Sequence, residues 1–215
     1  MNSTLSYRII FLLALLFTFT AQSQVVKIDK KELAFLADEE IVNVTFSFNN
    51  LLFNGDDITE VAFLSHIDEK IRRIQNDTIA ETFSSLYEQS KKEDFLIAYV
   101  QELNKTTRDY KKAPKFILNN DDAKYTMNVN ADWMYFGYNI GFVKQAAKLT
   151  TSITFFASES PDQIISKTVS SRATGVSYGD NFETEGGGIP CLKCMVNAYE
   201  RSAYTLARAL KRVLK

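Results

Sequence analysis

Residues 123–157 read AKYTMNVNADWMYFGYNIGFVKQAAKLTTSITFFA, and apolar and polar side chains alternate at both ends of this stretch. Alternation with period two is typical of a half-buried strand, because successive side chains point to opposite faces of a sheet. We expect a return strand over residues 149–157, with Ile153 and Phe155 pointing inward. The first strand places five residues on one face: Tyr125, Met127, Val129, Ala131 and Trp133. Between the two strands, residues 135–145 show no alternation and predict an irregular, aromatic-rich connection.

Further elements are expected on both sides of this pair. The pattern predicts strands over 41–48, 115–118 and 163–171, helices over 59–75 and 79–104, the latter with a break near 90–94, and a C-terminal amphipathic helix over 191–215. Three successive strands with short connections favour an antiparallel meander. We therefore predict an α+β, two-layer fold in which an antiparallel meander sheet is covered by helices and closed by the C-terminal helix. The glycine-rich residues 172–189 are expected to form a surface loop.

The amino terminus has the order of a secretory signal peptide. Arg8 precedes an apolar run over residues 9–17, and small and polar residues follow up to Gln24. We predict a signal peptide over residues 1–24, a single α/β domain over 25–215, and a periplasmic or secreted location. An uncleaved anchor is the alternative. The leader has no cysteine for lipid attachment, and no later stretch is apolar and long enough to span a bilayer.

The overall charge gives no indication of a nucleic-acid partner. Removing Arg8 with the leader leaves 24 basic and 26 acidic side chains. A nearly neutral chain predicts neither nucleic acid nor an anionic surface as its main partner. The oligomeric state is left open.

Cys191 and Cys194 are the two cysteines of the chain, and they lie at the start of the predicted C-terminal helix. A structural disulfide or two packed thiols is the default interpretation, and a reactive, closely spaced disulfide is the alternative because a helix amino terminus lowers a thiol pKa. Zinc would need four ligands, yet His66 is the one histidine. No nucleophile, phosphate-binding or metalloprotease motif is present, so we predict no catalytic residue, no metal and no cofactor.

An aromatic group lies at the end of the first strand and in the connection after it. Tryptophan and tyrosine combine apolar area with a polar tip, so these residues either line a ligand groove or close the core. The binding candidates are Trp133, Tyr135, Tyr138, Asn139 and Phe142. We expect any recognition to use this connection first.

The order of short motifs resembles an uncharacterised family of exported proteins from Bacteroidota. The matching residues are Ala123–Trp133, Gly137–Gly141, Ala147–Phe155, Ala198–Tyr199 and Leu206–Ala207. More distantly, the order of elements is similar to periplasmic α/β domains of the curli-secretion lipoprotein and TolB N-terminal type. The resemblance implies an envelope or assembly module, and it carries no catalytic residue over to this chain.

These observations predict an exported, non-enzymatic envelope protein that binds a partner, an envelope component or another protein, or assists an assembly. One alternative is a small-molecule or glycan-binding protein that uses the aromatic loop. The other alternative is a thiol redox protein acting through Cys191 and Cys194.

Overall fold

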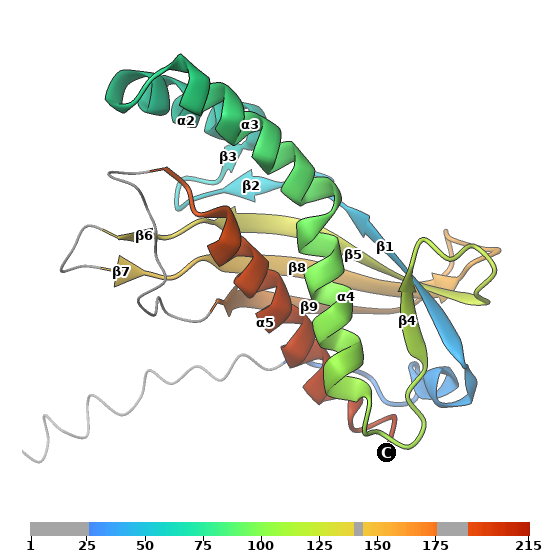
Figure 1. Ribbon diagram of the computed structural model, residues 1–215. Coiled ribbons are helices and arrows are strands. Elements are labelled where there is room, and N and C mark those ends of the chain that lie inside the picture. The colour runs from blue at the N-terminus through green and yellow to red at the C-terminus, as the bar shows by residue number, and fades with distance from the viewer. Residues whose placement is uncertain (1–25, 140–143, 176–188) are drawn as a thin grey trace, which may run out of the picture.

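The computed structural model describes residues 26–139, 144–175 and 189–215 (Figure 1). The predicted signal peptide, Phe142 and most of the predicted glycine-rich loop therefore lie outside the described residues. Within the described parts the fold is mixed α/β, with helices on a seven-stranded mixed sheet. No helix in these three ranges is long and apolar enough to cross a membrane.

The first half of the chain contributes four strands, of which the first and last are parallel neighbours, and the helices between them. It comprises η2 (Ala34–Asp38), β1 (Ile41–Ser47), β2 (Leu52–Phe53), β3 (Ile58–Thr59), α2 (Glu60–Ile74), α3 (Asp77–Lys92), α4 (Asp94–Thr107) and β4 (Lys115–Leu118). Thr59 caps α2, since its hydroxyl accepts the N–H of Ala62. The predicted break in the second helical region is confirmed between α3 and α4.

The second half contributes the meander and the closing helix. It comprises β5 (Tyr125–Tyr135), β6 (Tyr138–Asn139), β7 (Lys144–Gln145), β8 (Lys148–Ala157), β9 (Ile164–Thr174) and α5 (Leu192–Leu210). β5, β8 and β9 pair antiparallel in sequence order, which confirms the predicted meander. β6 pairs with β7 as a separate two-stranded ribbon.

The prediction of an antiparallel sheet is wrong for the other half of the sheet. β1 pairs parallel with β4 on one side and with β5 on the other, and β2 also pairs parallel with β5. The reason is that α2, α3 and α4 form a long crossover between β1 and β4, and such a connection returns the chain in the same direction. Local alternation predicts each strand but does not specify its partner.

A short polar linker then brings the chain from β4 to β5, on the other side of β1. Residues 119–124 make this step, although parallel strands usually need a dozen or more connecting residues. Asn43 of β1, which is buried, holds the linker. Its side chain accepts the N–H of Asn120 at 2.8 Å and donates to the hydroxyl of Thr126 at 3.1 Å.

The core lies between the sheet and the helices. Figure 1 shows α4 and α5 crossing in front of the sheet, with α2 and α3 over one end. The predicted apolar stripe of α5 is confirmed, since Tyr199, Leu206 and Leu210 are fully buried. Helical spacing predicts Val61, Leu64, Ile71 and Ile74 on the inward face of α2. This is wrong for Val61, which is 80% exposed, whereas Phe63 is buried and stacks on Phe53.

Candidate functional site

The face of the sheet that points away from α4 and α5 is polar, and we call it the open face. Inward side chains such as Val44, Met127 and Ile153 are buried, and their neighbours along each strand point the other way. Most strand residues of the open face are polar, charged or amphipathic: Thr45, Ser47, Asn128, Asn130, Asp132, Trp133, Tyr135, Lys148, Thr150, Ser152, Thr154, Lys167 and Arg172. The apolar Phe156, Ile164 and Val169 also point to this face. In Figure 1 both α4 and α5 are drawn in front of the sheet.

Hydrogen bonds between amide and hydroxyl side chains fix the centre of the open face. Ser47 donates to the side-chain oxygens of Asn128 and Asn130, at 3.0 and 2.9 Å. Asn128 in turn donates to the hydroxyl of Thr45. Because these side chains satisfy one another, the surface is held in one arrangement before any partner arrives.

A β-bulge at Asp132 ends the regular alternation of β5. Ala131 pairs with Thr151 and Trp133 pairs with Thr150, whereas Asp132 between them is not paired with a residue of β8. Its carboxylate accepts hydrogen bonds from the amide of Asn130 and the hydroxyl of Ser152, both at 2.7 Å. The extra residue changes which side chains point outward after it.

This bulge overturns the predicted face of Trp133. We expected Trp133 beside Met127 and Val129, but Met134 takes the inward position and Trp133 points to the open face. Phe136 points inward, where it stacks on Phe53 and Phe63. The aromatic group of the sequence is therefore divided between the core and the open face.

Trp133 and Tyr135 form a stacked pair in contact with two cations. Their ring centroids are 6.0 Å apart and nearly parallel. The guanidinium of Arg172 lies 5.7 Å from the Trp133 ring, and the ammonium of Lys148 lies 5.7 Å from the Tyr135 ring. Such cation–π contacts hold both cations at the surface and occupy part of the aromatic area.

The polar tips of the two rings bond within the chain. The indole N–H of Trp133 donates to the backbone oxygen of Asn54 at 2.7 Å. The hydroxyl of Tyr135 donates to the side-chain oxygen of Gln145 in β7 at 2.9 Å. This bond joins the β6–β7 ribbon to the sheet. Tyr138 and Asn139 form β6, and Phe142 lies outside the described residues.

Sequence reasoning missed the charged residues of this site. Lys148, Lys167 and Arg172 come from β8 and β9, and strand register brings the first and last of them beside Tyr135 and Trp133. Among the described strand residues of the open face, Asp132 is the one carboxylate. On the strands of this face the charged residues are thus mostly basic, although the chain as a whole is nearly neutral. We call Trp133, Tyr135, Lys148 and Arg172 the aromatic end.

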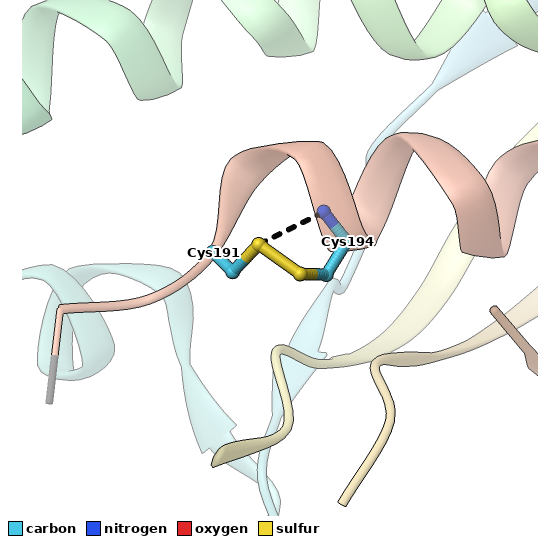
Figure 2. Close-up of a disulfide and its surroundings, with 2 residues drawn as sticks. All are labelled: Cys191 and Cys194. Atoms are coloured by element: carbon cyan, nitrogen blue, oxygen red, sulfur yellow. Dashed lines mark hydrogen bonds between the residues drawn. A yellow bond between two sulfur atoms is a disulfide. The ribbon is translucent and has the colours of Figure 1, made fainter. Parts of the chain in front are cut away.

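The cysteine pair lies at the first turn of α5. Figure 2 shows Cys191 and Cys194 joined by a disulfide. Cys191 is the N-cap, and its sulfur accepts the N–H of Cys194 at 3.1 Å. Gly175 connects this turn to the sheet, since its N–H bonds Ala147 and its Cα packs on the α5 backbone.

A second polar cluster lies between the helices and the sheet. Glu60 accepts a hydrogen bond from the hydroxyl of Tyr87 and pairs with Lys91 at 2.7 Å. Tyr99 and Tyr199 are fully buried, and neither hydroxyl has a hydrogen-bond partner among the described residues. Burial raises the pKa of Tyr99, Tyr199 and Tyr87, because the charged phenolate is poorly solvated there.

The remaining titratable candidates do not form a site within the described ranges. His66 is exposed on α2. No three His, Cys, Asp or Glu side chains in these ranges gather in a way that would hold a metal ion. Comparison with known proteins found no protein-family model and no curated protein that matches the chain.

Proposed function

We propose that the chain is an exported protein that binds an acidic surface of a partner protein through the open face of its sheet, with the aromatic end as the anchor. The observation that carries this proposal is the composition of that surface. Tryptophan, tyrosine and arginine supply much of the binding energy in protein interfaces. Here Trp133, Tyr135 and Arg172 lie together on one face of the sheet, with Lys148 beside them.

Charge complementarity determines the chemistry of the partner. Lys148, Lys167 and Arg172 outnumber Asp132 on the strands of this face, so an acidic surface is attracted and a basic one is repelled. The centre of the face is hydrogen-bonded within itself before binding, so ordering its side chains adds little to the cost of binding.

A glycan is a weaker candidate for the same surface. Sugar binding to aromatic residues uses the ring faces, and the faces of Trp133 and Tyr135 contact each other, Arg172 and Lys148. A sugar would have to displace these contacts before it stacked. A protein partner can contact the cations and the ring edges as they stand.

Photocrosslinking with a matched position on the helices tests the proposal. Val169 on the open face and Leu86 on α3 are similarly exposed, at 44% and 46%. Each is replaced in turn by benzoylphenylalanine, and the protein is irradiated with an envelope fraction of the producing organism. We expect a discrete protein adduct from position 169 and none from position 86. Lys167→Glu should abolish that adduct, whereas the matched charge change Lys92→Glu on α3 should leave it.

The other outcomes are informative as well. Equal adducts from both positions, or an adduct that is insensitive to Lys167→Glu, would exclude the open face as the binding surface. Saturable binding of a purified acidic polysaccharide such as alginate, blocked by Lys167→Glu and without any protein adduct, would replace the protein partner with a glycan. Binding should also weaken as salt is raised, because the interaction depends on surface charges.

A further inference from the structure

The two cysteines differ in how exposed they are. Cys191 is partly exposed at the start of α5, whereas Cys194 is 5% exposed and packs in the core. An incoming thiolate must approach one sulfur of a disulfide along the S–S axis. Access therefore favours attack at Cys191, and Cys194 becomes the leaving sulfur.

The start of α5 stabilises negative charge on the Cys191 sulfur. This sulfur already accepts the backbone N–H of Cys194, as Figure 2 shows. The first turn of the 19-residue helix carries no acidic side chain, and Lys193 adds a positive charge there. A helix amino terminus and a nearby cation both lower the pKa of a thiol, so the reduced form of Cys191 is favoured as a thiolate.

A purely structural disulfide is a poor explanation of this pair. A cross-link stabilises a protein mainly by constraining the unfolded chain, and the effect grows with the length of the closed loop. Only Leu192 and Lys193 lie between the two cysteines. Meanwhile Met195, Tyr199 and Leu206 already bury the inner face of α5 without the cross-link.

We propose that Cys191 and Cys194 form a redox-active disulfide that exchanges with an external dithiol at Cys191. This inference is independent of the proposed binding surface. A thiolate of the dithiol attacks the sulfur of Cys191, the Cys191–Cys194 bond breaks, and Cys194 leaves with the electron pair and takes a proton. The second thiol of the dithiol then loses its proton and attacks the dithiol sulfur that is bonded to Cys191. This step releases Cys191 as a thiolate. The dithiol is oxidised to a disulfide, and the cysteine pair is reduced by two electrons.

Single-cysteine variants test which sulfur is reactive. Cys194→Ser leaves Cys191 alone, and Cys191→Ser leaves Cys194 alone. Each variant is alkylated with iodoacetamide at pH 7, both folded and unfolded in urea. We expect Cys191 to react about three- to tenfold faster in the folded protein than in the unfolded one, because the folded helix raises its thiolate fraction. We expect Cys194 to react more slowly when folded. Equal rates for folded and unfolded Cys191 would overturn the proposal.

A measurement on the unaltered protein covers the case in which a variant fails to fold. The protein is treated with dithiothreitol at pH 7 without denaturant, and circular dichroism and thermal melting follow its fold. We expect complete reduction with the cooperative melting transition retained, and reoxidation when oxidised dithiothreitol is added. Reduction that requires denaturant, or that unfolds the protein, would show a structural disulfide and overturn the proposal.

Discussion

Gly175 is the residue with the least room for a side chain among the glycines whose surroundings are defined. A Cβ built on it would lie 3.1 Å from the backbone oxygen of Cys194 and 3.3 Å from the backbone nitrogen of Ala198. These atoms belong to the first turns of α5, so the strand end and the helix approach each other at backbone distance. Any larger residue must separate them.

Gly175→Ala should therefore lower the free energy of unfolding by about 1–3 kcal/mol, the usual cost of overpacking. Urea unfolding followed by circular dichroism gives this value. Gly55→Ala is the matched control, because nothing lies within 4 Å of a Cβ at that position. It should change stability by no more than about 0.5 kcal/mol. Similar losses in both variants would contradict the close packing at Gly175.

The buried tyrosines differ in what their hydroxyls contribute. Tyr87 donates to Glu60, whereas the hydroxyl of Tyr199 is buried and unpartnered in the described structure. A hydroxyl buried without a hydrogen bond costs free energy, and one bonded to a carboxylate stabilises. Tyr199→Phe should raise the free energy of unfolding by about 1 kcal/mol, and Tyr87→Phe should lower it by about 1.5–3 kcal/mol. Chemical denaturation of both variants checks the signs, and a loss on Tyr199→Phe would indicate a hydrogen-bonding partner for that hydroxyl.

At the scale of elements, the two outer edges of the sheet differ in what bonds to their backbone. On β4, the side chain of Asn104 from α4 donates to the backbone oxygen of Phe116 at 2.8 Å and accepts its N–H at 2.9 Å. The amide thus takes the place of a neighbouring strand and protects this edge from pairing with another chain. β9, at the opposite edge, pairs with β8 alone among the described strands.

Asn104→Ala removes both bonds, so the N–H and the carbonyl oxygen of Phe116 lose their partner. It should lower the free energy of unfolding by about 1–3 kcal/mol. It should also increase aggregation, measured by light scattering, because the edge of β4 becomes available. Gln101→Ala is the control, an exposed amide on the same helix. Alanine favours helix, so this variant should be neutral or slightly stabilising. An equal effect of the two substitutions would exclude a role for Asn104 at the sheet edge.

Elements with strong periodicity could be predicted from the sequence. Which of their side chains point inward was harder to predict. The strands around Met127 and Ile153 follow the expected alternation, and α5 buries the expected stripe. Trp133 was placed on the wrong face because a single extra residue, Asp132, resets the alternation, and no local pattern marks a bulge. Val61 was expected inside because it fits the helical spacing, yet Phe63 offers more apolar area to the core.

At the scale of the whole molecule, the candidate site depends on contacts that a linear pattern does not contain. The sequence indicated Trp133 and Tyr135, but Lys148 and Arg172 reach them only through the pairing of β5 with β8 and of β8 with β9. In the same way, β1 has β4 as a parallel neighbour because a long helical crossover returns the chain in the same direction, and β5 as a second one because the short linker 119–124 passes to the other side of β1. Strand order and register come from burying one common core, so they are properties of the complete chain.

The tyrosines in that common core should make the whole fold sensitive to alkali. Burial raises the pKa of Tyr87, Tyr99 and Tyr199 above the ordinary value near 10, so the folded protein keeps these protons when the unfolded chain has lost them. Their contribution to stability is complete below pH 10 and is lost as the pH rises toward the folded pKa values. Each tyrosine reduces the free energy of unfolding by about 1.4 kcal/mol per pH unit in this window. The three together give a slope of about 4 kcal/mol per pH unit.

Urea unfolding at half-unit steps from pH 9 to pH 11.5 measures this slope. Tyr199→Phe removes one of the three groups, so its slope should be smaller than that of the unaltered protein by about 1.4 kcal/mol per pH unit. Lysine titration occurs in the same range but is common to both proteins, and the difference between their slopes therefore isolates Tyr199. Identical slopes would mean that Tyr199 ionises equally in the folded and unfolded states, which is incompatible with its complete burial beneath α5.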